Sequence, residues 1–202
     1  MSPKEKQKSI FTKAIHSGED RARYADSITT PIVQSSTYFF KDSKEIESYT
    51  KNAKKRYEYG RYGNPTEIVA QQRLMVLNSA DDALVFSSGM MAITTTILAL
   101  VESGDHIVIT DDCYGRTLEF CRTYLKRFGI DCTIVPFGDY ELLDSSIREN
   151  TRFVFSESPT NPYLNVFDMV KFRHIGDKHK VITIIDSTFA TPYNQRPLDY
   201  GI

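Results

Sequence analysis

The chain has 202 residues, of which 41% are hydrophobic and 25% charged, and its formal net charge is −1. This composition is typical of a globular protein, and without a basic excess we expect no nucleic acid as a main partner. The longest apolar stretch, around residues 93–101, is too short to span a bilayer, so we expect no membrane segment. Three cysteines without metal-ligand spacing favour a reducing compartment, and we expect a cytoplasmic protein with no metal centre.

Residues 1–60 are polar and aromatic with weak periodicity, and they are interpreted as an extended N-terminal arm. A helix is then expected from Thr66, a plausible N-cap that follows Pro65, with Glu67 in the positive first turn. Further helices are predicted over residues 89–104, 115–129, 140–150 and 166–180. Strands are predicted over residues 83–88, 106–110, 131–137, 152–158 and 181–186.

This alternation of strands and helices indicates an α/β fold with a largely parallel sheet and helices on both faces. The strands are apolar along their whole length, which is typical of a sheet buried on both sides. We therefore expect an arm over residues 1–60 and an α/β domain over residues 61–202. In such sheets ligands bind beyond the carboxyl ends of the strands, so the loops that follow the strands are the candidate site.

The first two of these loops offer groups suited to a phosphate and a planar ring. Ser87, Ser88 and Gly89 directly precede a helix, where backbone amides and a small residue suit a phosphate, although an ordinary capped turn has the same pattern. The second loop carries Tyr114, which can stack on a planar ring or be a half-buried tyrosine.

The third and fourth loops offer polar groups at two further strand ends. Glu157 and Asn161 lie in "ESPTNP", where two prolines stiffen the loop, and a plain loop is the alternative. Asp186 ends the last strand, where it can pair with a protonated ring nitrogen or cap the following turn. All four loops share one rim if the strands are parallel, and this joint placement favours a cofactor site.

The motifs "YGRYGNPT", "SSGM", "DCYGRT", "ESPTNP" and "DSTFATPYNQRPL" together resemble the Cys/Met-metabolism family of enzymes that depend on pyridoxal 5'-phosphate (PLP), the transsulfuration enzymes. The resemblance covers residues 27–202 and is strongest to the cystathionine γ-synthases. It implies the large domain of fold type I, the aspartate aminotransferase-like fold of PLP-dependent transferases, present here in part.

The resemblance also implies the roles of individual residues. The phosphate would be bound by the backbone amides of Gly89 and Met90, next to Ser88, and by Tyr59 and Arg61 from a neighbouring subunit. Tyr114 would stack on the ring and is the candidate catalytic residue. The remaining ring contacts would come from Glu157, Asn161, Asp186 and Thr188.

The implied reaction is γ-replacement, in which cysteine replaces the leaving group of an activated homoserine. A cystathionine or methionine γ-lyase is the alternative, and an inactive PLP-binding or assembly module is an alternative of another class. The implied assembly is a homotetramer with shared active sites.

In this family the Schiff-base lysine lies in Ser-x-Thr-Lys, shortly after the stretch that begins at Asp186. No lysine follows Asp186 in these 202 residues, and the literal match at residues 48–51 lies in the arm and is interpreted as chance. The implied C-terminal domain is also absent, so we expect these residues alone to be inactive.

Overall fold

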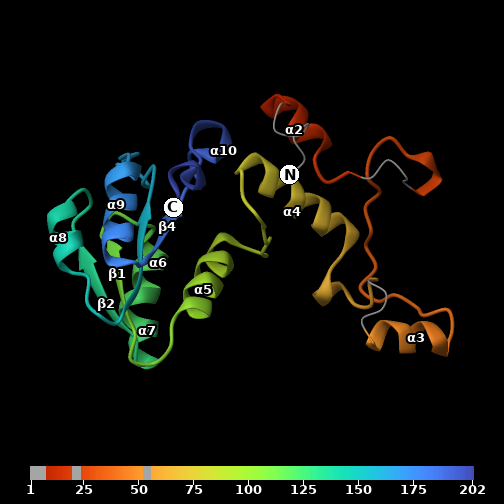
Figure 1. Cartoon of the computed structure of the whole chain (residues 1–202), viewed down its shortest axis with the longest axis horizontal. Coiled ribbons are helices and arrows are strands. Elements are labelled where there is room, and N and C mark those ends of the chain that lie inside the picture. Colours follow the sequence, from red (N-terminus) through yellow and green to blue (C-terminus); the bar gives the residue numbers. More distant parts are fainter. Residues whose placement is uncertain (1–7, 20–23, 52–55) are drawn as a thin grey trace. The chain divides into compact units, whose positions relative to one another are not determined.

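The computed structural model describes residues 8–19, 24–51 and 56–202 (Figure 1). Contacts divide the chain into two compact units, an N-terminal unit over Met1–Val85 and a C-terminal unit over Phe86–Ile202. The expected boundary between an arm and a domain near residue 60 stays a prediction.

The N-terminal unit contains short helices joined by irregular segments. They are α2 (Ile10–His16), the 3₁₀ turn η1 (Tyr24–Asp26), α3 (Ser43–Thr50), the 3₁₀ turn η2 (Gly60–Tyr62) and α4 (Pro65–Leu77). The arm expected from the sequence therefore includes α2 and α3, which its weak periodicity did not reveal. Local capping explains them, because the side chains of Ser9 and Asp42 accept the amides of Thr12 and Glu45, respectively.

The helix α4 begins where expected but with a different cap. Asn64, not Thr66, is the N-cap, and its Oδ1 accepts the Thr66 amide at 2.8 Å. The Thr66 hydroxyl instead accepts the amide of Val33 at 2.9 Å. Pro65 at the first helical position explains the shift, because proline needs no hydrogen bond there and fixes φ for the helix.

The C-terminal unit contains a four-stranded parallel sheet in the order β2-β1-β3-β4. Its strands are β1 (His106–Thr110), β2 (Asp131–Val135), β3 (Thr151–Glu157) and β4 (Ile182–Asp186). The other elements are α5 (Gly89–Leu100), α6 (Gly115–Glu119), the π-helical turn η3 (Phe120–Tyr124), α7 (Leu125–Arg127), α8 (Tyr140–Ser145), α9 (Met169–His179), α10 (Thr191–Asn194) and the 3₁₀ turn η4 (Pro197–Tyr200).

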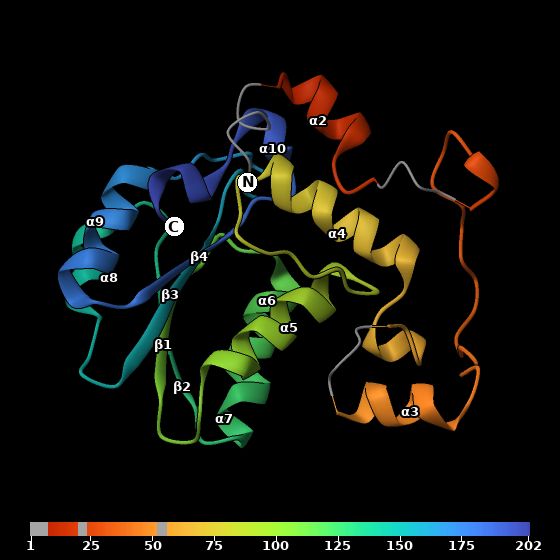
Figure 2. The same cartoon turned by 45° about the vertical axis from the view of Figure 1, so that its right-hand side comes forward.

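Helices cover both faces of this sheet, as predicted (Figure 2). Alternate side chains of each strand point to opposite faces and enter two separate cores. On one face Ile107 and Phe153 pack with Ile97 of α5 and Leu125 of α7. On the other face the core packs against α8 and α9, and its buried members are Val108, Val135, Leu143, Val154, Phe167, Phe172 and Ile175.

The strand predicted over residues 83–88 is absent, and this expectation is wrong. Residues 82–86 have no regular structure, and the side chain of Leu84 is 71% exposed. An apolar run forms a strand only where a neighbouring strand binds its backbone, and no described residue pairs with this segment. None of the described helices is long and apolar enough to cross a membrane.

Candidate functional site

The loops at the carboxyl ends of the strands surround one cavity of about 380 Å³ in the C-terminal unit. This volume lies within the range of small-molecule sites. Most of the residues that the sequence placed in these loops line it, but Ser87 does not, and Ile93 and Phe189 complete the lining. The loop before α5 takes part although the strand expected before it is absent. The expected members are Ser88, Gly89, Met90, Tyr114, Glu157, Asn161, Asp186 and Thr188.

The start of α5 forms one wall of this cavity. Ser88 is the N-cap, and its hydroxyl accepts the amide of Met91 at 3.1 Å. The amides of Gly89 and Met90 belong to the first turn, where amides have no acceptor within the helix. A Cβ at Gly89 would meet no atom within 4 Å, so the space before this residue is open. Free amides, a positive helix end and open space together suit an anion such as a phosphate.

Glu157 joins two loops of the cavity. Its Oε2 accepts the backbone amide of Tyr114 at 2.6 Å, and its Oε1 accepts the amide of Asn161 at 3.1 Å. Glu157 is buried at the end of β3, whereas the Tyr114 side chain is 43% exposed. The tyrosine ring is therefore held by its backbone and remains accessible to a planar ligand.

Asp186 ends β4 directly beside Glu157, because the two residues are register partners in the parallel pair. One Asp186 oxygen, Oδ1, accepts both the amide and the hydroxyl of Thr188, at 3.0 and 2.5 Å. These bonds fix the carboxylate in orientation, and its second oxygen can accept a hydrogen bond from a ring N–H.

Carboxylates accumulate at this edge of the sheet. Burial raises the pKa of Glu157, and the nearby charges of Asp186 and Asp112 raise it further, while the amides of Tyr114 and Asn161 oppose this shift. A cationic group bound here would offset the repulsion between these acids. Cys113 is a poor nucleophile, because burial raises the pKa of its thiol to about 12.

Sequence reasoning missed Gln195, which connects the loops after β3 and β4. Its Nε2 donates to the carbonyl of Ser158 at 2.7 Å and to the hydroxyl of Ser187 at 2.9 Å. Ser158 Oγ in turn accepts the Phe167 amide at 3.0 Å. The only available signal was the place of Gln195 in the motif "DSTFATPYNQRPL", which says nothing about these contacts.

Tyr59 and Arg61 lie in the N-terminal unit, and their relation to the cavity stays a prediction. Both belong to the region of η2, where the guanidinium of Arg61 stacks over the rings of Tyr59 and Tyr62, at 4.9 and 5.3 Å from the ring centres. Lys51, from the literal Ser-x-Thr-Lys match, is the C-cap of α3 and pairs with Glu47 at 2.5 Å. The interpretation of this match as chance stays a prediction.

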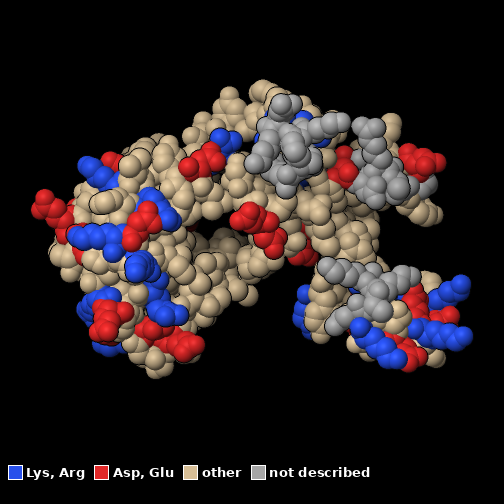
Figure 3. Space-filling view, in the orientation of Figure 1, with Lys and Arg blue, Asp and Glu red and all other residues tan. Residues whose placement is uncertain are grey.

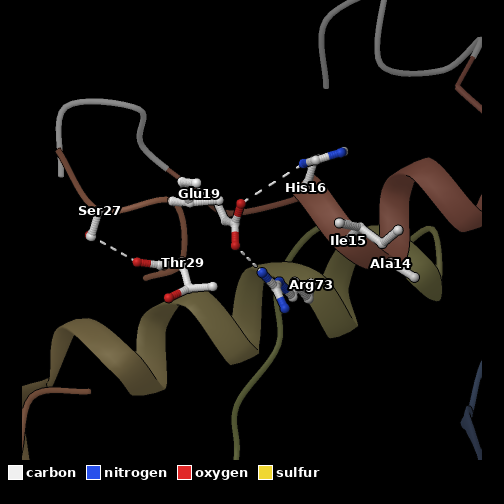
Figure 4. A pocket seen from close by; sticks show the side chains of 8 residues that line it. Ala14, Ile15, His16, Glu19, Ser27, Thr29 and Arg73 are labelled. Atoms are coloured by element: carbon white, nitrogen blue, oxygen red, sulfur yellow. Dashed lines mark hydrogen bonds and ion pairs between the residues drawn. The ribbon is translucent and has the colours of Figure 1, made fainter. Parts of the chain in front are cut away.

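A larger cavity of about 650 Å³ lies in the N-terminal unit, between the region of α2 and the helix α4 (Figure 4). Its polar side chains already have partners: Glu19 accepts from Arg73 and lies 3.9 Å from His16, and the Ser27 hydroxyl donates to the backbone carbonyl of Thr29 at 2.9 Å. These pairings make the cavity a poorer ligand site than the rim of the sheet, despite its size.

The charged side chains outside the rim do not favour one kind of partner. On the face of the C-terminal unit that Figure 3 shows, basic and acidic side chains are interspersed. Several of them form ion pairs, including Lys178 with Asp144 and Arg196 with Asp199. The rim is therefore the best candidate for a specific ligand in this unit.

Comparison with known proteins identifies the family. Residues 11–202 match the family described as Cys/Met metabolism PLP-dependent enzyme. The chain is 41% identical over 190 residues to cystathionine gamma-synthase 1, chloroplastic, of Arabidopsis thaliana, covering 93% of this chain and 34% of the relative. It is 36% identical over 204 residues to L-methionine gamma-lyase of Treponema denticola, covering 100% of this chain and 51% of the relative.

A solved structure agrees with both the fold and the cofactor. The putative O-acetylhomoserine (thiol)-lyase of Campylobacter jejuni, which carries a pyridoxyl-lysine monophosphate at its position 205, superposes with a TM-score of 0.89 at 30% identity. The match covers 97% of this chain and 48% of that protein. The chain thus spans about a third to a half of the length of these relatives. It has the fold type I architecture, in part, and it belongs to the Cys/Met-metabolism family of PLP-dependent enzymes.

Proposed function

We propose that the cavity at the rim of the sheet is the PLP site of a transsulfuration enzyme of the cystathionine γ-synthase type. The observation that carries this proposal is the convergence of four loops on one cavity, with a helix N-terminus, an accessible tyrosine and a fixed carboxylate. Each of these groups suits a different part of PLP: the phosphate, the ring face and the ring nitrogen.

Different residues of the chain would bind different parts of the cofactor and orient it. The amides of Gly89 and Met90 would bind the phosphate, and Tyr59 and Arg61 of a neighbouring subunit would add to them. Tyr114 would cover one face of the ring, and the side-chain amide of Asn161 would donate to the ring oxygen. Asp186, held by Thr188, would keep the ring nitrogen protonated through its free oxygen.

When bound, PLP supplies an electron sink for the carbanion formed next to the amino group of an amino acid. The protonated ring nitrogen sustains this sink, which makes Asp186 the residue of this chain with the largest expected effect on the chemistry. The proposed reaction is replacement of the γ-substituent of an activated homoserine by cysteine. The proposed assembly is a homotetramer with shared sites, in the cytoplasm.

Two alternatives remain as distinct outcomes. A γ-lyase would release a keto acid and ammonia, and the Treponema relative is named as an L-methionine gamma-lyase. An inactive module would bind PLP or a full-length relative without turnover. The second alternative is motivated by the cavity lining, because none of the described residues that form it is a lysine.

The test starts with the native protein isolated from its source. Its intact mass decides whether it is longer than 23.1 kDa. Assays with PLP, an activated homoserine and cysteine then measure cystathionine, keto acid and ammonia. Cystathionine as the main product supports the proposal, and keto acid formed without cysteine supports the lyase. PLP binding without either product leaves the inactive module.

A further inference from the structure

Glu157 differs from the other cavity residues because both of its carboxylate oxygens are bound by backbone amides. One oxygen binds the loop after β1 through Tyr114, and the other binds the loop after β3 through Asn161. We propose that Glu157 is a positioning residue, which fixes these two loops so that Tyr114 and Asn161 meet the cofactor ring in one orientation. This inference rests on the proposed function, and it differs from the direct cofactor contact that the sequence motifs suggested.

The position of Glu157 makes it a firm anchor. It is the last residue of β3, which lies between β1 and β4 in the sheet, and only 6% of its surface is exposed. Its neighbour Ser158 donates its amide to the Asp186 carbonyl at 2.9 Å, which extends the ladder with β4. The bonds from Glu157 therefore connect the two ligand-facing loops to the central part of the sheet.

Tyr114 depends on this anchor more than an ordinary helix residue does. It is the N-cap of the continuous helical segment formed by α6, η3 and α7, so its amide has no acceptor within the helix, and its side chain makes no capping bond. Its amide lies at the end of the loop that follows β1, where the 2.6 Å bond to Glu157 holds it. Loss of that bond would leave the Tyr114 backbone held only through its carbonyl, which accepts the amides of Thr117 and Leu118 at 2.8 and 3.1 Å, and the orientation of the ring would be less well fixed.

A charged carboxylate at this position is energetically unfavourable, so its presence indicates a specific role. Burial and two neighbouring acids, Asp186 and Asp112, disfavour its charged form. A glutamine of the same shape would avoid this cost, but it has one acceptor oxygen and would place an N–H₂ group against the second amide. A carboxylate is thus the side chain of this length that accepts both amides.

The experiment compares the full chain with its Glu157→Gln variant. Glu102→Gln is the control, because Glu102 is exposed and precedes β1, so it lies near the amino-terminal ends of the strands and away from the cavity at their carboxyl ends. The probe is pyridoxamine 5'-phosphate, which needs no lysine to bind. Hydrogen exchange at the Tyr114 and Asn161 amides is followed by NMR without probe, and affinity and induced circular dichroism are measured with it.

We expect Glu157→Gln to speed exchange at both amides and to weaken probe binding roughly tenfold, the size of one charge-assisted hydrogen bond. The dichroism per bound probe at saturation should also fall, because the ring is held less uniformly. A purely structural role would lower the melting temperature and leave this saturated signal unchanged. Unchanged exchange at either amide, or an unchanged saturated signal, would overturn the inference.

A measurement on the unmodified chain covers the case in which the variant does not fold. The shifts of the Tyr114 and Asn161 amides should follow the titration of the Glu157 carboxyl carbon with a common midpoint, and Asp112 and Asp186 are followed in the same spectra. An amide that does not follow Glu157 contradicts the positioning role. If the unmodified chain fails to bind the probe, the proposed function fails, while exchange and titration still decide the role of Glu157.

Discussion

The two units of the chain differ in how much of their apolar surface is buried. In the C-terminal unit, strand and helix residues such as Ile107, Phe153 and Phe172 have no exposed surface. In the N-terminal unit, Val76 is the only buried hydrophobic residue among the described ones, whereas Ile28 and Phe39 are 92% and 86% exposed. The C-terminal unit has its own core, and the described part of the N-terminal unit depends on capping and polar pairs.

This difference shows which kind of evidence each unit can give about function. A ligand cavity keeps its geometry where its walls are the ends of packed strands, as in the cavity that contains Glu157 and Asp186. The N-terminal unit exposes many large apolar side chains, and such surface is typical of a region that binds another protein surface. The proposed role of Tyr59 and Arg61 at a neighbouring subunit agrees with this property.

The largest expected effect is the loss of a core side chain of the C-terminal unit. Phe153→Ala removes a ring with no exposed surface from between the sheet and α5, and we expect unfolding to become easier by about 3–5 kcal/mol. Phe39→Ala, in the N-terminal unit, should change stability by less than about 0.5 kcal/mol. Urea unfolding measures both. Equal losses for the two variants would show that Phe39 is covered in solution and would break the comparison.

The second prediction concerns His106, the first residue of β1, whose ring connects the two neighbouring strands β2 and β3. Its ring nitrogens bind the hydroxyls of Thr151 and Thr133 at 2.7 and 2.8 Å. Burial, aided by the charge of Arg148, lowers the pKa of His106 from 6.5 to about 4. The folded state therefore favours the neutral ring, and its contribution is complete above pH 6.5 and is lost as the pH falls towards 4.

This shift corresponds to a loss of about 3 kcal/mol of unfolding free energy between pH 7 and pH 4. His106→Gln should be less stable at pH 7 but should lack this part of the pH dependence. His16→Gln, at an exposed site of the N-terminal unit, should keep it. Urea unfolding at several pH values measures the difference. Parallel curves for the original chain and His106→Gln would contradict the prediction.

The third prediction tests the rim of the cavity. Asp186→Asn keeps an oxygen for Thr188 but removes the charge, so binding of pyridoxamine 5'-phosphate should weaken about tenfold to a hundredfold. Asp131→Asn removes a carboxylate at the opposite end of the sheet and should leave the affinity unchanged. Equilibrium dialysis measures both. Equal affinity for the original chain and Asp186→Asn would exclude the proposed contact with the ring nitrogen.

The sequence predicted the C-terminal unit much better than the N-terminal one, for a physical reason. Buried parallel strands such as β1 are continuous apolar runs, and their carboxyl ends share one edge, so the positions of Tyr114, Glu157 and Asp186 followed from local patterns. Pairings between distant loops leave no such pattern. The contacts of Gln195 with Ser158 and Ser187 therefore could not be predicted.

The same reasoning explains the wrong strand over residues 83–88. This segment is a short apolar run, as β1 is, but a strand also requires a neighbouring strand that binds its backbone. Composition does not reveal such a neighbour. The N-cap of α4 was misplaced by two residues because Asn64 and Thr66 are both good caps and only the fold shows which amide each oxygen meets. The family motifs indicated a cofactor. The hydrogen bonds of individual cavity residues, such as those of Glu157, became known only from the structure.

The smallest expected effect tests whether polar pairs organise the N-terminal unit. Asn64 caps α4 through Oδ1 and donates from Nδ2 to the Val33 carbonyl at 2.8 Å, so it connects the helix to a distant segment. Asn64→Ala should destabilise α4 by about 1 kcal/mol, and Asn64→Asp, which keeps the cap but not the donor, should cost less. Hydrogen exchange should then rise in residues 65–77 and stay unchanged in β1. If β1 also exchanges faster, the two units unfold together, and the core of one stabilises the other.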